Sequence, residues 1–292
     1  MGVMSRPAAS TEALVLRCWP CGETSTIASL LTRDHGFVKV IAKGARGPRS
    51  QLRPLIEPGR LVNVEFSLDA RRELQYLRGG GVDLDPLARE ATLEKTAYLL
   101  GALELVDRCR PYEDFSHPGT SGADSSAGGP SDGAAYAGDL FEICGQFVRM
   151  LSSPSCRRPA LLFFSFEWEL LARHGITPEV AGCVSCGEEP TGGQGSPLRF
   201  SAADGGVVCG TCAGRDGVQN GRPLGTEALA YLREMARPTA TLDEAAAGES
   251  ALPRQMRREL GALLHGFLGY HLPGYRLPAA LELLRAGKDS EG

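Results

Sequence analysis

Residues 25–45, STIASLLTRDHGFVKVIAKGA, are the most informative stretch for the fold of the N-terminal part of the chain. Two apolar runs flank the polar turn RDHG, which is typical of a β-hairpin. In the second run Val38, Val40 and Ala42 fall on one face of a strand, and the residues between them fall on the other, because strand side chains alternate. This pattern predicts two neighbouring strands with one face turned toward a core.

Three further β-rich runs lie around this hairpin. They are TEALVLRC at 11–18, GRLVNVEFSL at 59–68 and ELQYLRGG at 73–80. Five short strands within about 70 residues predict a small closed or nearly closed barrel, of which the OB-fold is the common case. We therefore expect an α+β multidomain protein with an N-terminal OB-fold barrel and a C-terminal α-helical domain.

The pattern becomes helical after Gly81. Asp85 is the expected N-cap and Pro86 the first position of a helix that runs to about Cys109. Residues 116–138 are rich in Gly, Ser and Ala and predict a flexible insertion. The expected domains are an OB-fold at 1–82, a helical domain in two parts at 83–179 and 219–292, and a cysteine-rich module at 180–218.

Four cysteines in the cysteine-rich module form two C-x-x-C pairs: Cys183, Cys186, Cys209 and Cys212. Each pair makes a tight turn that directs two thiolates to one point, and two such turns supply the four-sulfur shell that Zn²⁺ accepts. A zinc ion with four protein ligands has no open position, so the predicted role of the metal is structural. A redox-switch zinc site is the alternative.

Cys18 and Cys21 form a third C-x-x-C in the stretch CWPC, without a second pair. The motif lies where a predicted strand enters a turn and not at a helix N-terminus, where the helix dipole would lower a thiol pKa. We interpret the spacing as a coincidence. A zinc-containing thiol redox protein that uses these two cysteines is the alternative function.

The chain has a net charge of −4, but the segment from Arg33 to Arg60 carries seven basic and two acidic residues, a net charge of +5. A basic strand face and a Gly/Pro-rich loop can contact phosphates without reading sequence. OB-type barrels bind single strands in this way and add aromatic stacking. The alternatives are a solvated loop or a non-DNA interaction adaptor whose loop binds an acidic protein.

The composition is that of a soluble globular protein, with 42% hydrophobic and 23% charged residues in 292. There is no apolar run long enough for a membrane span and no apolar leader at the N-terminus. These features predict a cytoplasmic protein without a membrane partner. No P-loop, G-x-S-x-G or H-E-x-x-H motif occurs. We therefore predict that the protein is not an enzyme.

The whole chain resembles the RecO family of bacterial recombination mediators over about residues 11–286. The resemblance rests on ALVLRCWPCGETSTIASLLTRDHG followed by FVKVIAKGARGPRSQL, on the four-cysteine knuckle, and on the tail FLGYHLPGYRLPAALELL. Its most specific part is the AKGAR stretch at 42–46. The resemblance implies an OB-fold, a helical domain, an inserted zinc module and a bacterial, nucleoid-associated protein.

The resemblance also implies a function in DNA repair through the RecFOR pathway. That function comprises binding of single- and double-stranded DNA, annealing of complementary strands and a partnership with RecR. It further includes recognition of the C-terminal tail of single-strand-binding protein, so that RecA can load onto coated DNA. The expected DNA-binding residues are Lys39, Lys43, Arg46, Arg49, Arg53, Arg33 and Arg17. The expected partner-binding residues in the helical domain are Arg254, Arg257 and Arg258.

Overall fold

The computed structural model describes most of the chain. The described residues are 8–69, 71–108, 130–192, 197–215, 221–238, 240–247, 251–272 and 274–286. The chain forms two compact units: unit 1 comprises Met1–Ser152 and Pro278–Gly292, and unit 2 comprises Ser153–Leu277. Unit 1 combines the barrel with helical segments. The predicted domain boundaries stay a prediction.

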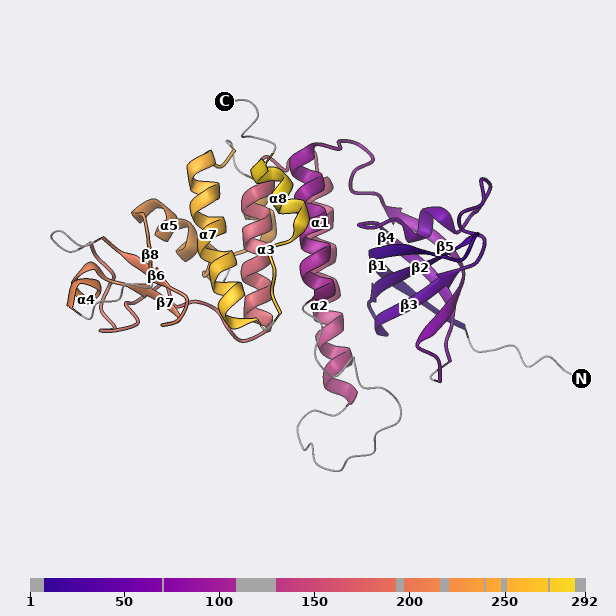
Figure 1. The fold of residues 1–292 in the computed structure, drawn as a ribbon, viewed down its shortest axis with the longest axis horizontal. Coiled ribbons are helices and arrows are strands. Elements are labelled where there is room, and N and C mark those ends of the chain that lie inside the picture. The colour runs from indigo at the N-terminus through magenta and orange to yellow at the C-terminus, as the bar shows by residue number, and fades with distance from the viewer. Residues whose placement is uncertain are drawn as a thin grey trace, which may run out of the picture. The chain divides into compact units, whose positions relative to one another are not determined.

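A closed five-stranded barrel forms the N-terminal part of unit 1 (Figure 1). Its strands are β1 (Ala8–Cys21), β2 (Ser25–Thr32), β3 (Gly36–Ala42), β4 (Leu61–Ser67) and β5 (Leu74–Leu84). They are hydrogen-bonded in the order β1-β2-β3-β5-β4, and β4 closes the barrel on β1. The pair β3–β5 is parallel and the others are antiparallel. The predicted barrel fold is confirmed.

Alternate residues of the strands form the interior of the barrel, and those of β3 are the ones that the strand alternation predicted. Val38, Val40 and Ala42 of β3 are buried, and so are Val62, Val64 and Phe66 of β4. The residues between them on both strands are half-buried or exposed. Small and branched side chains can fill so narrow a barrel without leaving voids. A short 3-10 helix, η1 (Arg53–Ile56), adds Leu55 and Ile56 to this core.

A β-bulge interrupts β1 and changes which side of the strand faces outward. Val15 pairs with Leu30 of β2, whereas the next paired residue, Arg17, aligns with Ser29. Leu16 is the extra residue. Beyond the bulge the odd-numbered residues of β1 therefore face away from the core. No sequence signal had predicted this change.

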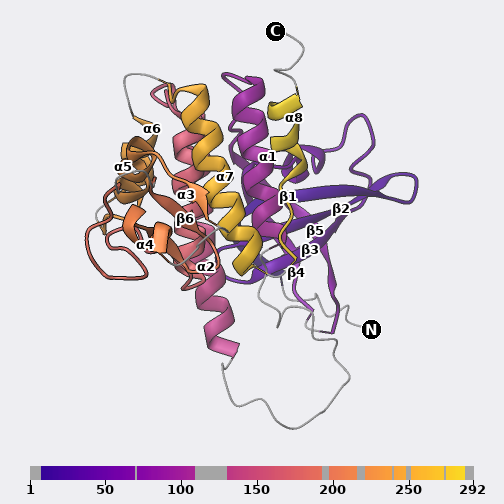
Figure 2. The same ribbon diagram turned by 60° about the vertical axis from the view of Figure 1, so that its left-hand side comes forward.

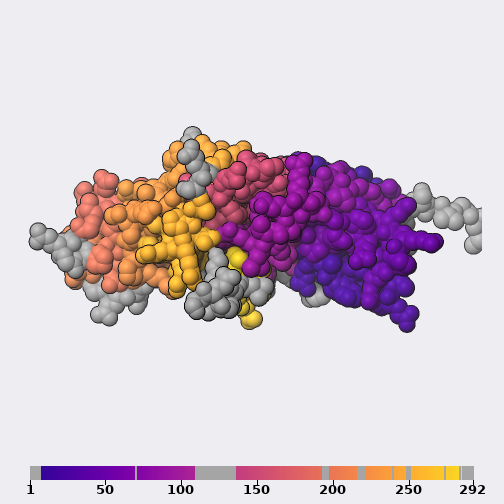
Figure 3. All heavy atoms as spheres, turned by 90° about the horizontal axis from the view of Figure 1, so that it is seen from above, coloured from indigo at the N-terminus to yellow at the C-terminus, as the bar shows by residue number. Residues whose placement is uncertain are grey.

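Three helices complete unit 1: α1 (Leu93–Arg108), α2 (Pro130–Ser152) and α8 (Ala279–Ala286). Helices α1 and α8 lie side by side (Figures 1 and 2), although they are far apart in sequence. In Figure 3 the barrel and α1, coloured indigo to purple, form one continuous packed surface. Helix α1 contacts β1, and α2 contacts β2 and β3.

Two predictions for this region differ from the structure. The first helix begins at Leu93, not at Pro86, and Thr92 caps it: Oγ1 of Thr92 accepts a hydrogen bond of 3.1 Å from the N–H of Lys95. Asp85 instead closes a separate turn with the N–H of Leu87 and accepts hydrogen bonds of 3.0 and 2.7 Å from Arg60. Residues 130–138 of the predicted flexible insertion belong to α2. The rest of that insertion, 116–129, lies outside the described residues, as does Cys109.

Unit 2 contains a helical core and a small cysteine-rich module. The helices of the core are α3 (Pro159–Arg173), α5 (Thr226–Met235), α6 (Leu242–Ala246) and α7 (Arg254–His271). The module consists of β6 (Arg199–Ser201), β7 (Gly206–Val208), β8 (Arg222–Pro223) and α4 (Gly210–Arg215), gathered together in Figure 1. Helix α3 is apolar on most faces and is buried at nearly every position.

In the part of the chain that the structure describes, no helix combines the length and hydropathy needed to cross a lipid bilayer.

Candidate nucleic-acid interface and metal site

Four cations lie at one rim of the barrel, where β3 ends and the following loop leads to η1. Lys43, Arg46, Arg49 and Arg53 are exposed there. The loop is held in place by Arg46, whose backbone N–H donates to the carbonyl oxygen of Thr24 at 2.9 Å. Its Nη1 donates to the carbonyl oxygen of Gly22 at 3.2 Å. Within the described ranges, none of these four cations forms an ion pair with a carboxylate, so all four are available to an anionic ligand.

The other three predicted DNA-binding residues are engaged within unit 1. Arg17 pairs with Asp107 of α1 at 3.3 Å, and Lys39 pairs with Glu73. Arg33 lies between Glu12 of β1 and Glu142 of α2 and contacts both carboxylates. Although burial opposes its charge, these two carboxylates raise the pKa of Arg33. A phosphate would have to compete with carboxylates for these three residues.

Arg72, which the sequence alone did not single out, adds a cation to the same region, where it pairs with Asp69 at 3.4 Å. Its guanidinium lies 5.7 Å from the centre of the Tyr76 ring, and Nζ of Lys43 lies 4.7 Å from the same centre. Arg72 lies outside the basic segment 33–60, and only the pairing of β3 with β5 brings it close to Lys43. Arg72 and Lys43 are far apart in the sequence, so the sequence alone did not indicate that they lie close together.

The four cysteines of unit 2 converge in the cysteine-rich module. Their sulfur atoms all lie within 4.8 Å of one another, and Sγ of Cys186 is 3.9 Å from Sγ of Cys209. Sulfurs bonded to one tetrahedral metal at ~2.3 Å stand about 3.8 Å apart, so this spacing fits a single ion. Gly187 follows the pair Cys183 and Cys186 and forms a turn with a positive φ of 77°. Gly210 lies within the pair Cys209 and Cys212, where it begins α4 and does not have a positive φ. The cluster can hold a metal ion.

Backbone groups around the cluster favour thiolates at some of the four positions. The N–H of Cys209 donates to Sγ of Cys183 at 3.2 Å. Burial opposes ionisation of Cys183, but N–H donation from Cys209, Ser185 and Cys186 outweighs it and lowers the pKa of its thiol to about 6. Hydrogen bonds with Cys209 and Cys186, followed by burial, raise the pKa of Cys212 to about 12. Four thiolates this close together need a cation to balance their charge.

The third C-x-x-C does not have the geometry of a dithiol. Cys18 and Cys21 both belong to β1, where they pair with Ala28 and Ser25 of β2. Three residues along a strand cover about 10 Å and end on the opposite face, whereas a disulfide requires Cα atoms less than about 7 Å apart. The strand thus supports the interpretation of this spacing as a coincidence.

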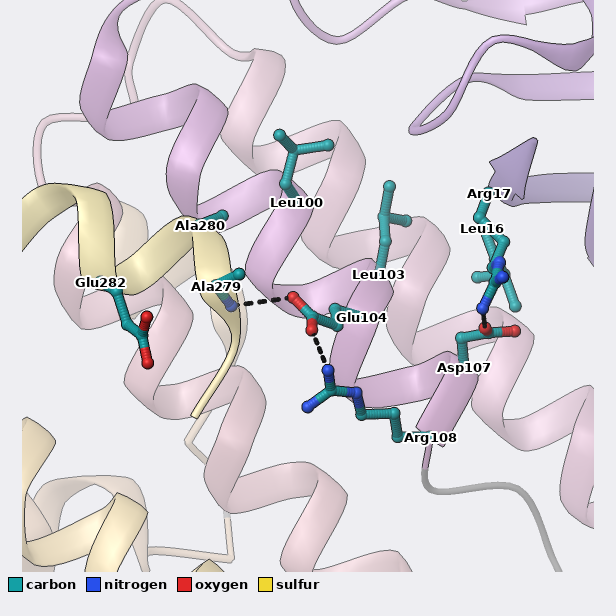
Figure 4. A pocket seen from close by; sticks show the side chains of 10 residues that line it. All are labelled: Leu16, Arg17, Leu100, Leu103, Glu104, Asp107, Arg108, Ala279, Ala280 and Glu282. Carbon is teal, nitrogen blue, oxygen red and sulfur yellow. Dashed lines mark hydrogen bonds and ion pairs between the residues drawn. The ribbon is translucent and has the colours of Figure 1, made fainter. Parts of the chain in front are cut away.

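A cavity of about 790 Å³ lies in unit 1 between β1, α1 and α8 (Figure 4). Leu16, Leu100 and Leu103 form its apolar wall. The charged residues at its edge are largely paired with one another: Arg17 with Asp107, and Arg108 with Glu104. Oε2 of Glu104 also accepts a hydrogen bond of 3.0 Å from the N–H of Ala279, at the start of α8.

The three predicted partner-binding arginines do not line this cavity. Arg254, Arg257 and Arg258 lie in the first turns of α7, in unit 2. A cavity in unit 2 between α3, α5 and α6 has a volume of about 20 Å³, room for little more than one water molecule. It does not include these arginines either. Their role in partner binding stays a prediction.

The described fold and its sites define a class: an OB-fold barrel with a basic rim, joined in one chain to a helical domain that carries a four-cysteine cluster able to hold a metal ion. Comparison with known proteins identifies the family. Residues 4–82 match the family model "Recombination protein O N terminal", and residues 135–280 match "Recombination protein O C terminal". The chain belongs to the RecO family of DNA repair proteins.

Three similar relatives are each named DNA repair protein RecO. The protein of Anaeromyxobacter dehalogenans (strain 2CP-C) is 30% identical over 272 residues, which cover 91% of this chain and 92% of the relative. The protein of Bacillus subtilis (strain 168) is 29% identical over 205 residues, 70% of this chain and 69% of the relative. The protein of Myxococcus xanthus (strain DK1622) is 27% identical over 279 residues, which cover 95% of this chain and 98% of the relative.

Proposed function

We propose that the protein is a recombination mediator in bacterial DNA repair. It binds single- and double-stranded DNA and anneals complementary strands. Together with RecR, it helps load RecA onto DNA coated by single-strand-binding protein, whose C-terminal tail it recognises. The observation that carries the DNA-binding step is the set of four exposed cations at one barrel rim, none of which pairs with a carboxylate in the described part of the chain.

The cations also support the annealing step. Binding of phosphates by Lys43, Arg46, Arg49 and Arg53 reduces the repulsion between two strands and raises their local concentration. Such contacts hold the backbone and leave the base edges free to pair. No bond is made or broken in this process, so the protein acts without being an enzyme.

The metal in this proposal is Zn²⁺, held by the four cysteines as a structural ion. Four thiolates fill a tetrahedral shell and leave no position for water or substrate. The ion holds the two C-x-x-C turns of unit 2 together, whereas the basic rim belongs to unit 1. Metal binding and DNA binding are therefore separable properties of the chain.

Binding of a labelled oligonucleotide across a salt series tests the proposal. Lys43→Gln combined with Arg46→Gln should weaken binding and lower the slope of log K against log salt by about 1.4, because each phosphate contact to a single strand contributes about 0.7. Arg258→Gln, an exposed arginine of unit 2, removes one charge away from the rim and is the control for each single variant, Lys43→Gln or Arg46→Gln. Unchanged affinity and slope in the double variant would instead favour the adaptor that binds an acidic protein.

A further inference from the structure

One cysteine of the four-sulfur cluster differs from the other three in its exposure to solvent. Cys183, Cys209 and Cys212 are only 2%, 6% and 8% exposed, whereas Cys186 is exposed. Cys186 ends the first C-x-x-C turn, inside a run of exposed residues at 185–189. A small solute can therefore reach Cys186 without any unfolding of unit 2, but it cannot reach the other three cysteines in this way.

A second sulfur lies within reach of the exposed one. Sγ of Cys209 is 3.9 Å from Sγ of Cys186, and it accepts a hydrogen bond of 3.4 Å from the N–H of Cys212. A disulfide bond is ~2.05 Å long, so the two sulfurs would have to approach each other by only about 1.9 Å. An accessible cysteine beside a second cysteine that can resolve it is typical of redox-sensitive sites.

We propose that Cys186 is a site of oxidation by hydroperoxides, that Cys209 resolves the product as a disulfide, and that the metal is released as a result. The inference rests on the four-sulfur metal site of the proposed function and does not depend on DNA binding, because the cluster belongs to unit 2 and the basic rim to unit 1. A thiol that coordinates a metal is deprotonated, and the thiolate is the nucleophilic form of cysteine.

The reaction has two steps, written here for hydrogen peroxide. The Cys186 thiolate attacks one peroxide oxygen, so that an S–O bond forms, the O–O bond breaks, and hydroxide leaves and takes up a proton to become water. The Cys209 thiolate then attacks the resulting sulfenic acid, so that an S–S bond forms and a second hydroxide leaves and is protonated. The two thiolates lose two electrons and the peroxide is reduced to water. Cys183 and Cys212 remain, too few ligands for a tetrahedral shell.

Contacts of Arg233 on α5 favour a reversible change. Its Nε and Nη2 donate to the carbonyl oxygens of Val180 and Ala181 at 3.0 and 3.1 Å, and its Nη1 pairs with Glu189 at 3.4 Å. These anchors lie on both sides of the first C-x-x-C turn and do not involve sulfur. They keep the turn near the second pair after the metal is released, so reduction of the disulfide by a thiol can restore the cluster.

Zinc release from the loaded, full-length protein tests the assignment. Cys186→His and Cys212→His each keep a fourth ligand, because three cysteines and one histidine also hold zinc. Hydrogen peroxide should release zinc from the wild type and from Cys212→His at similar rates, followed with a chromogenic chelator. Release from Cys186→His should be about tenfold slower, because the sulfurs that remain are buried. Equal rates in all three proteins would overturn the role of Cys186.

Mass spectrometry of the unaltered protein provides a second measurement, which does not depend on the folding of any variant. Brief treatment with peroxide in the presence of dimedone, which traps sulfenic acids, should label Cys186 before the three buried cysteines. Without dimedone the product should contain a disulfide between Cys186 and Cys209, and dithiothreitol should restore zinc binding. A first label on a buried cysteine, or a disulfide within one C-x-x-C pair, would refute this mechanism.

The failure of this inference can be distinguished from that of the metal assignment. Wild-type protein that holds zinc and keeps it under peroxide would overturn the oxidation site alone. Wild-type protein that never binds zinc would overturn the metal in the proposed function.

Discussion

Glu167 of α3 and His265 of α7 face each other inside unit 2, with Oε1 of the glutamate 3.0 Å from Nε2 of the histidine. The Glu167 side chain is fully buried. Among the described residues neither side chain forms a directional hydrogen bond, so each depends on the other for its polar environment. Removal of one partner leaves a buried polar group unpaired, which is far more costly than replacing both by apolar groups.

The pairing of Glu167 with His265 predicts that substitutions of the two residues have non-additive effects on the free energy of unfolding. His265→Ala should lower the free energy of unfolding by about 3 kcal/mol, because the Glu167 carboxylate loses its partner. Combining Glu167→Leu with His265→Leu should recover most of that loss. Urea unfolding of the single and double variants measures the coupling. If the effects of the single substitutions simply add, the two groups do not stabilise each other.

Gly80 of β5 is predicted to be intolerant of any side chain. It has a φ of +148°, and a Cβ atom there would lie 2.0 Å from the carbonyl oxygen of Asn63 on β4. Gly81 has no atom within 4 Å of its Cβ position and is the matched control. Gly80→Ala should destabilise the protein by more than about 2 kcal/mol, and Gly81→Ala by less than about 0.5 kcal/mol. Thermal unfolding that gives equal losses would contradict this account of the β4–β5 pairing.

The position of Arg33 between Glu12 and Glu142 predicts that its main contribution is to the structure of unit 1. Arg33→Gln should lower stability by about 1 kcal/mol, a small value because the side chain is 38% exposed and water screens the pairs. Its effect on oligonucleotide affinity should be smaller than that of Lys43→Gln, which removes a charge that has no carboxylate partner among the described residues. A larger loss of affinity for Arg33→Gln would show that the arginine leaves its carboxylates to contact DNA.

Loss of one cysteine ligand should remove the metal and leave DNA binding intact. Cys183→Ser is expected to reduce bound zinc well below one ion per chain, measured by elemental mass spectrometry, and to destabilise the protein by about 3 kcal/mol or more. Oligonucleotide affinity should not change, because the basic rim lies in unit 1. Cys21→Ser, outside the cluster, is the control and should retain the metal. Full zinc content in Cys183→Ser would exclude the four-sulfur site.

The thiol of Cys18 should react slowly at neutral pH even though the residue is exposed. Partial burial, and then the nearby charge of Glu57, raise its pKa above the ordinary 9.0. Thiolate is the reactive form, so a raised pKa lowers the reactive fraction at pH 7 and moves the rise in rate to pH above 9. Alkylation followed by peptide mass spectrometry across pH measures this. Fast alkylation near pH 7 would instead favour the alternative function, a thiol redox protein that uses Cys18 and Cys21.

Local patterns in the sequence predicted much of this protein. The alternation of Val38, Val40 and Ala42 placed the core face of β3, because side chains of a strand must point to opposite sides. The spacing of the two C-x-x-C pairs predicted the sulfur cluster, because each turn fixes its own two thiols. Such features depend on residues close in the chain, and short-range geometry is sufficient to determine them.

Contacts between residues that are distant in the sequence determined the features that local patterns did not predict. Arg60 engages the carboxylate of Asp85, 25 positions later in the chain. The bulge after Val15 turns Trp19 outward, and the pairing of β3 with β5 brings Arg72 close to Lys43. Composition showed that the segment 33–60 is basic, but only folding showed which cations already have partners. The reason is physical: the pairing of charges and the alignment of side chains depend on distances across the barrel, and closure of the barrel fixes those distances.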